Sequence, residues 1–283
     1  MARALFVAAA DILAAGALRG WIESGNEVAE IWTDPGFPLP GSQRTMSTWA
    51  PGWSVRSLAR THGIPARTMP ASWRRWTGVT EAVSGLAVDV LITCVTMQIV
   101  PPAILDMFAG RAVNFHPALL PNYRGPSPYL GTILDGRDDC AGVTLHELTA
   151  GIDEGPTIAA TPVSYAACGR RYPTWKARHA AAARRLGRTA LPAFLAGGLP
   201  SRPQGEGLYR RVREEIRIGP QMTAAEARRT ASLIGRTGRL EIAGRRGVHV
   251  RAVTGDAGLP TGAPPDIGPL SVTIDVADRR LRL

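Results

Sequence analysis

Residues 112–126 read AVNFHPALLPNYRGP. The apolar start of this stretch predicts a short buried strand, and His116-Pro117 marks the point where the chain leaves it as a loop. Successive side chains of a strand point to opposite faces, so Asn114 and His116 share one face while Phe115 packs on the other. The stretch therefore predicts two polar side chains presented together at the end of a strand.

An amide beside an imidazole is a combination suited to acyl transfer. Moving a one-carbon acyl group between nitrogens passes through a tetrahedral intermediate, which needs a donor for the oxyanion and a group that handles the amine protons. Asn114 and His116 supply these two functions. The turn GIDEG at residues 151–155 adds Asp153, a carboxylate that orients the imidazole, raises its basicity or relays a proton through water.

Each of these residues also has a purely structural interpretation. The histidine can be a core residue with satisfied hydrogen bonds, the asparagine can cap a strand end, and the Asp153 segment can be an ordinary turn. The order and spacing of all three together favour the catalytic interpretation.

Strand and helix patterns alternate along the first 200 residues. Apolar runs typical of buried strands occur at 4–9, 28–32, 88–94, 112–115, 142–148 and 157–163, and helical patterns occur at 11–24, 54–62, 103–108, 127–134 and 175–195. This alternation predicts an α/β fold with a Rossmann-like, mostly parallel sheet and helices on both faces. Ligands bind at the carboxyl ends of such strands, which is where Asn114 and His116 fall.

The segment GGLPSRP at residues 197–203 is typical of a linker. It divides the chain into an expected catalytic domain, residues 1–200, and a small C-terminal domain, residues 201–283. In the latter, Thr223 is predicted to cap a helix that continues through Ile234. Short strands are predicted at 238–243, 248–253 and 271–275, so we expect a β-rich or mixed appendage.

The residues around Asn114 and His116 resemble those of the folate-dependent formyltransferases. The resemblance rests on these two residues, the LLPNYRG run at 119–125, the GVT at 142–144 and the Asp153 loop, and it is clear from about residue 88 to 163. It implies that 10-formyltetrahydrofolate, as co-substrate, donates its formyl group to a primary amine. It also implies that Asn114 and protonated His116 stabilise the oxyanion and that Asp153 sets the protonation of the imidazole.

The resemblance further implies a pterin site beside the catalytic residues. It would involve the segment after the strand at 88–94 and the loop that leads into Asp153, mostly through backbone groups and apolar side chains. The residues expected to contact the folate are Thr96, Met97, Gln98, Val100, Ala150, Gly151 and Ile152. A dinucleotide site is disfavoured, because the first strand runs into AAAD at residues 8–11 and not into a Gly-rich fingerprint.

The acceptor amine is less closely defined by the sequence. Glycinamide ribonucleotide formyltransferases use a Gly-rich loop after the first strand, which this chain lacks. Methionyl-tRNA formyltransferases carry a lysine-rich insertion where residues 36–49 hold Arg44 as the only charge. We therefore prefer a small-molecule acceptor, either an amino sugar nucleotide or an amine of specialised metabolism. The alternatives are formylation of methionyl-tRNA and, from a different class, a non-catalytic folate- or nucleic-acid-binding protein.

The bulk composition adds little to this choice. The formal charge of +10 fits a nucleic-acid partner, but Lys176 is the only lysine, and a bias in genomic base composition produces an arginine excess without any functional demand. Cys94, Cys140 and Cys168 are odd in number and widely spaced, which predicts reduced thiols and no metal site. Without a long apolar stretch we expect a cytoplasmic enzyme with no membrane partner, whose oligomeric state, a dimer included, stays open.

Overall fold

The computed structural model describes residues 1–34, 53–211, 216–237, 240–242, 245–248, 255–256, 258–261, 266–267 and 272–282. Contacts divide the chain into a first unit, residues 1–128 and 139–210, and a second unit, residues 129–138 and 211–283. The segment 201–210 thus belongs to the first unit, and the domain boundary expected after residue 200 stays a prediction. Residues 36–49, which the sequence analysis compared with a lysine-rich insertion, fall outside the described residues.

A seven-stranded sheet forms the centre of the first unit, in the order β3-β2-β1-β4-β5-β6-β7. Its strands are β1 (Arg3–Ala8), β2 (Glu27–Thr33), β3 (Ala66–Thr68), β4 (Val90–Cys94), β5 (Ala112–His116), β6 (Gly142–Glu147) and β7 (Thr157–Pro162). The strands β1 to β5 run parallel to one another. The strand β6 runs antiparallel to β5, and β7 runs antiparallel to β6. The predicted Rossmann-like, mostly parallel α/β class is confirmed.

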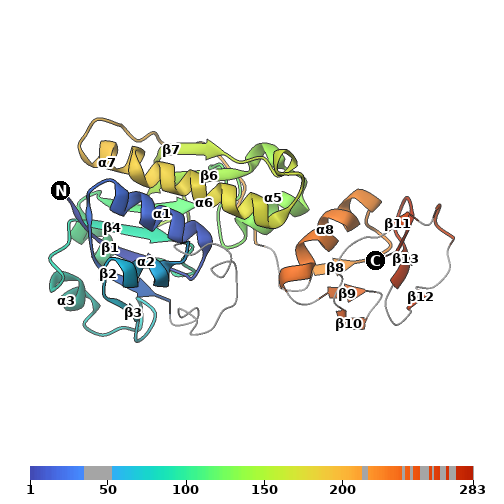
Figure 1. The fold of residues 1–283 in the computed structure, drawn as a ribbon, viewed down its shortest axis with the longest axis horizontal. Helices are drawn as coiled ribbons and strands as arrows, with labels where there is room; N and C mark the ends of the chain where they lie inside the picture. Colours follow the sequence, from blue (N-terminus) through green and yellow to red (C-terminus); the bar gives the residue numbers. More distant parts are fainter. Residues whose placement is uncertain are drawn as a thin grey trace. The chain divides into compact units, whose positions relative to one another are not determined.

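Helices cover both faces of this sheet (Figure 1). They are α1 (Ile12–Glu23), α2 (Val55–Thr61), α3 (Val79–Ser84), α4 (Pro102–Leu105), α6 (Tyr172–Arg188) and α7 (Ala190–Leu195), with 3₁₀ turns η2 (Asp106–Phe108) and η4 (Ala166–Cys168). Val83 of α3, Ile104 of α4 and Phe108 pack in one core cluster with Leu5 and Leu91 of the sheet. Strands buried by helices on both sides explain the continuous apolar runs seen in the sequence.

Helices α1 and α6 lie side by side in unusually close contact (Figure 1). A Cβ built on Gly16 would lie 2.1 Å from the Ala180 carbonyl oxygen, so only glycine allows the two backbones to approach this closely. The helix α1 begins as predicted at Asp11, whose Oδ1 accepts from Leu13 N at 2.8 Å. The other carboxylate oxygen of Asp11 pairs with Lys176 on α6 at 2.7 Å.

The single helix predicted at 175–195 is wrong in one respect, because it is broken at Thr189 into α6 and α7. Thr189 has φ −120° and ψ −57°, outside the helical range. Pro192 explains the break, since in a continuous helix its ring would clash with the carbonyl of Arg188 and it has no N–H to donate there.

The second unit is mixed, with helices α5 (Pro128–Leu134) and α8 (Ala224–Thr237) and two small sheets. The strands are β8 (Ile216–Ile218), β9 (Leu240–Ile242), β10 (Arg245–Val248), β11 (Gly255–Asp256), β12 (Asp266–Ile267), β13 (Val272–Asp275) and β14 (Arg280–Arg282). The predicted cap of α8 is confirmed as a capping box, in which Glu226 accepts from Thr223 N at 2.8 Å and Glu226 N donates to Thr223 Oγ1 at 3.3 Å. Most of the strand expected at 248–253 falls outside the described residues.

None of the described helices combines the length and the apolar character needed to cross a bilayer. Cys94 and Cys140 are buried thiols and Cys168 is half-buried. Cys94, at the end of β4, is completely buried in the core.

Candidate active site

Three neighbouring strands align the first polar groups of the site. Asn114 on β5 pairs in register with Thr93 on the parallel strand β4 and with His146 on the antiparallel strand β6. These residues therefore form one row across the sheet, and their side chains meet on the same face. All of them are buried, which removes their hydrogen bonds from competition with water.

The carboxamide of Asn114 is oriented by its neighbours. Its Oδ1 accepts from the Thr93 hydroxyl at 2.9 Å, and its Nδ2 lies 3.0 Å from His146 Nε2 and 3.4 Å from Asp153 Oδ1. A flipped amide would turn its oxygen toward the Asp153 carboxylate, which accepts only, so the neighbours require the amide to present its NH₂ to them. The NH₂ of Asn114 is thus directed at the centre of the site.

His116 is held by one ring nitrogen only. Its Nε2 lies 2.8 Å from the carbonyl oxygen of Tyr123, which accepts, so Nε2 carries a proton. Its Nδ1 lies 3.5 Å from Asp153 Oδ2. When His116 is neutral, Nδ1 and the carboxylate are both acceptors, and a proton located between them is bound by the pair.

Asp153 reaches the site from the turn between β6 and β7. It adopts a left-handed backbone conformation with φ +53°, and its Oδ2 accepts from Gly125 N at 2.8 Å. Its side chain is 15% exposed, compared with 4% for the side chain of His116. The structure thus brings together Asn114, His116 and Asp153, which the sequence separates by up to 39 positions.

The pKa values of the pair respond to burial in different ways. Burial lowers the pKa of His116, and the charge of Asp153 opposes this shift. Burial would raise the pKa of Asp153, but His116, His146 and the Gly125 N–H together hold it below the ordinary value. Asp153 is therefore a carboxylate at neutral pH, while the protonated state expected for His116 stays a prediction.

His146 belongs to this constellation and the sequence analysis missed it. Its Nδ1 lies 2.7 Å from the Glu147 carbonyl oxygen, so Nδ1 carries the proton and Nε2 is free to accept from Asn114. Its Nε2 also lies 3.6 Å from Asp153 Oδ1. No local sequence pattern pointed to His146. The antiparallel register of β5 and β6 in the structure brings position 146 opposite position 114.

The residues expected to contact folate lie in two loops next to these strands. Thr96 Oγ1 accepts from Gln98 N at 3.3 Å, and Gln98 Oε1 accepts from Trp73 N at 2.9 Å, so these side chains hold loop structure. Val100 is buried in the core cluster of α4, whereas Met97 is 52% exposed. In the second loop, Ile152 is 39% exposed. Two large apolar side chains are thus available to a ligand at this edge of the sheet.

A pocket of about 400 Å³ lies between the helix after β4 and the loop that leads to Asp153. Its lining residues are Pro102, Leu105, Asp106, Ala109, Gly110, Ala112, Leu148, Thr149 and Ala150. Of the seven residues expected at the folate, Ala150 lines this pocket and the other six do not. The pocket is mostly apolar, and its volume falls in the range of small-molecule sites.

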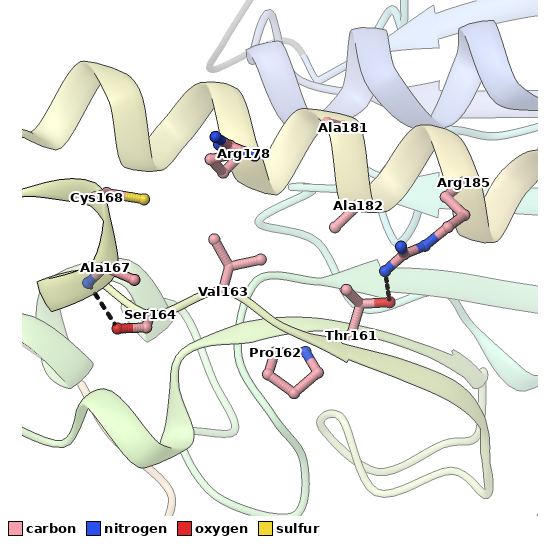
Figure 2. Close-up of a pocket in the computed structure, with 10 residues that line it drawn as sticks. All are labelled: Thr161, Pro162, Val163, Ser164, Ala167, Cys168, Arg178, Ala181, Ala182 and Arg185. Atoms are coloured by element: carbon pink, nitrogen blue, oxygen red, sulfur yellow. Dashed lines mark hydrogen bonds between the residues drawn. The ribbon is translucent and has the colours of Figure 1, made fainter.

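A separate pocket of about 390 Å³ lies between β7, η4 and α6 (Figure 2). Figure 2 shows Arg185 reaching from α6 to Thr161 on β7, where its Nη2 donates at 3.2 Å. The ten described residues that line it include none of the candidate site residues. Among the described residues, no group of three or more His, Cys, Asp and Glu side chains is arranged to hold a metal ion.

Residues 42–171 match the family model described as Formyl transferase. This part of the chain is similar to the formyl transferases. The matched range contains Asn114, His116, His146 and Asp153, so the four side chains that meet at the strand ends all lie within the formyl transferase region.

Curated relatives of this formyl transferase region are similar over part of their length. A methionyl-tRNA formyltransferase from Chromobacterium violaceum is 30% identical over 163 residues, which cover 58% of this chain and 51% of that enzyme. The chain thus spans about half the length of the curated relatives that it matches.

Solved structures of formyl transferases share the fold. Glycinamide ribonucleotide transformylase 1 from Symbiobacterium toebii is 25% identical with a TM-score of 0.53, and the match covers 72% of this chain and 95% of that one. An N-formyltransferase from Helicobacter canadensis, solved with folinic acid and dTDP-3-aminofucose, is 16% identical with a TM-score of 0.67. That match covers 98% of this chain and 97% of the other.

Proposed function

We propose that this chain is an N-formyltransferase that moves the formyl group of 10-formyltetrahydrofolate to the primary amine of a small-molecule acceptor. The observation that carries the proposal is that the Asp153 carboxylate lies 3.4 Å from Asn114 Nδ2 and 3.5 Å from His116 Nδ1. The family of residues 42–171 supports the same chemistry. The proposed catalytic domain lies within residues 1–200.

The residues beside Asp153 fit a folate co-substrate. The pocket lined by Leu105, Ala112 and Leu148 is apolar enough for a flat ring system, and Ala150 joins it to the turn that carries Asp153. The exposed side chains of Met97 and Ile152 offer further apolar surface to a ligand. The residues proposed to hold the folate are Thr96, Met97, Gln98, Val100, Ala150, Gly151 and Ile152.

The folate supplies a formyl group on N10, which passes to the acceptor amine as a carbon–nitrogen bond forms there and the bond to N10 breaks. The amine loses one proton and N10 gains one, so the transfer needs no oxidant or reductant. Asn114 donates from Nδ2 to the formyl oxygen as negative charge develops on it. The thiols and hydroxyls of the chain are not required as nucleophiles.

The His116–Asp153 pair handles the proton. Tyr123 holds Nε2 of the imidazole, so Nδ1 is the atom that exchanges protons, and the Asp153 carboxylate stabilises the imidazolium that results. The positive charge of protonated His116 adds to the stabilisation of the oxyanion by the Asn114 donor. A water between Asp153 and N10 would complete the path, since the carboxylate is the most exposed member of the pair.

A small acceptor is preferred on the sequence of residues 36–49, where Arg44 is the only charge. Recognition of a tRNA acceptor stem depends on several contacts from Lys or Arg to phosphates, and this segment offers one. The Helicobacter canadensis enzyme, whose fold matches along the whole chain, was solved with an amino sugar nucleotide, which gives the preferred acceptor class a concrete member.

Methionyl-tRNA is the second candidate acceptor. The observation that favours it is that the curated relatives with 30–34% identity are methionyl-tRNA formyltransferases. The net charge of +10 is compatible with a nucleic-acid substrate as well.

An acceptor panel tests the proposal. Release of tetrahydrofolate from 10-formyltetrahydrofolate would be followed with amino sugar nucleotides, small amines, methionyl-tRNA and uncharged tRNA, with His116→Ala as the inactive control. Turnover with a small amine supports the proposal. Turnover restricted to methionyl-tRNA would show that methionyl-tRNA is the acceptor and would overturn the proposed small-molecule class. Folate binding without transfer to any amine would favour a non-catalytic binding protein.

A further inference from the structure

Gln204 lies beyond the region matched by the family model, on the segment 202–210 that follows α7. Backbone hydrogen bonds fix this segment on both sides of Gln204. Arg202 exchanges two 2.8 Å hydrogen bonds with Thr157, and Arg124 N donates to Leu208 O at 2.9 Å while its carbonyl accepts from Arg210 N at 2.8 Å. Gln204 is therefore held at a defined position on the first unit.

The carboxamide of Gln204 uses all of its hydrogen-bonding groups. Its Nε2 donates to the carbonyl oxygens of Asp153 at 3.0 Å and Gly155 at 2.6 Å. Its Oε1 accepts from Arg124 Nε at 3.2 Å and Arg124 Nη2 at 3.0 Å. Two carbonyls on one side and a guanidinium on the other leave a single orientation for this amide.

The two turns joined by Gln204 are the turns that position the catalytic pair. The turn around Arg124 supplies the Tyr123 carbonyl that binds His116 and the Gly125 N–H that binds the Asp153 carboxylate. The other turn carries Asp153 itself. Gln204 therefore links the support of His116 directly to the backbone of Asp153.

The backbone of Asp153 needs such support. Its φ of +53° is uncommon for a residue with a side chain, and such conformations persist when surrounding contacts hold them. The Asp153 carbonyl, which follows this strained dihedral directly, is one of the two acceptors of Gln204.

We propose that Gln204 is a positioning residue that holds the Asp153 carboxylate against His116 by joining the Asp153 turn to the Arg124 turn. The expected effect of Gln204 on turnover rests on the proposed function. Its expected effect on the position of Asp153 does not. The titratable groups that face His116 are Asp153 and His146. Because the Asp153 charge raises the pKa of His116 against burial, a displaced Asp153 leaves that pKa lower.

The test combines kinetics with an NMR titration of the His116 imidazole in the full-length chain. Gln204→Ala removes the amide, and Gln204→Glu keeps its size and its acceptor for Arg124 but replaces the donors to the two carbonyls. Arg202→Ala is the matched control, since Arg202 is exposed and its hydrogen bonds to Thr157 are made by its backbone. His116→Gln assigns the imidazole signal.

For both Gln204 variants we expect kcat to fall by roughly a hundredfold, the loss that a displacement of the Asp153 carboxylate by about 1 Å would cause. The KM for 10-formyltetrahydrofolate should change much less. The pKa of His116 falls in Gln204→Ala and is unchanged in Arg202→Ala, whereas the carboxylate introduced by Gln204→Glu opposes the fall, so that variant is compared by kcat alone. A His116 pKa in Gln204→Ala equal to that of the control overturns the proposal whatever the turnover. A wild-type chain that transfers no formyl group, while the pKa shift is present, refutes the proposed function and leaves the positioning role standing.

Discussion

His116 Nδ1 lies 3.5 Å from Asp153 Oδ2, while the opposite ring nitrogen is held by a backbone carbonyl. This arrangement fixes the tautomer of the imidazole without using the carboxylate. The carboxylate is consequently free to stabilise a proton on Nδ1 when one arrives. A pair that binds a proton only during the reaction is suited to carry it from an attacking amine to a leaving nitrogen.

Asn114→Ala should lower kcat by a factor of about a hundred or more, because it removes one donor to the developing oxyanion. Binding of the folate should change little, since Asn114 contacts other members of the site and lies off the apolar pocket. Steady-state kinetics and calorimetric titration with a folate separate the two effects. Loss of folate binding in this variant would mean that Asn114 shapes the pocket and does not act on the reacting group.

Asp153→Asn should lower kcat and shift its pH dependence. The charge of Asp153 raises the pKa of His116, so removing that charge lowers the pKa and moves the loss of the protonated imidazole to more acidic pH. The measurement is kcat from pH 5 to 9 in about half-unit steps. An unchanged pH profile with reduced kcat would show that Asp153 acts on the substrate and not through His116.

His146→Ala should lower kcat by roughly tenfold, as expected for an indirect role that orients a catalytic group. The substitution removes the imidazole that lies 3.0 Å from Asn114 Nδ2 and 3.6 Å from Asp153 Oδ1. His62→Ala is the control, because His62 is exposed at the end of α2. Equal kcat in the two variants would remove His146 from the account.

The prediction for His146 also shows where sequence reasoning stops. The cap at Thr223 and most strand and helix positions could be predicted, because apolar periodicity and capping are local properties of the chain. The antiparallel direction of β6 and the contacts of Gln204 with Asp153 join positions that are distant in sequence. Local patterns carry no information on such pairings, so His146 and Gln204 required the structure.

Gly16→Ala should destabilise the first unit by about 3 kcal/mol, the upper end for overpacking, because the new Cβ meets backbone and not a movable side chain. Gly219→Ala is the matched control, since a Cβ there meets no atom within 4 Å. Thermal and urea unfolding of both variants provide the comparison. Equal stability would show that α1 and α6 can separate without loss.

Acid should destabilise the chain through His179. Burial lowers its pKa to about 4 despite hydrogen bonds with backbone groups. In the unfolded state the histidine becomes protonated near pH 6.5, whereas in the folded state it stays neutral until about pH 4. The unfolded state therefore binds more protons between these values, and the free energy of unfolding falls from about pH 6.5 down to about pH 4. The expected loss is about 3 kcal/mol. His179→Gln should flatten the free energy of unfolding over this window, and an unchanged slope would contradict the assignment.

The most direct test of the central claim follows the formyl carbon itself. The wild-type chain, Asn114→Ala and Asp153→Asn would each be mixed with 10-formyltetrahydrofolate carrying a ¹³C-labelled formyl group and with a dTDP-linked amino sugar, and the products analysed by NMR. The account predicts a ¹³C-formamide on the acceptor with the wild type and little or none with either variant. Labelled formamide formed equally by all three, or a label that stays on the folate while the wild type binds it, would contradict the account.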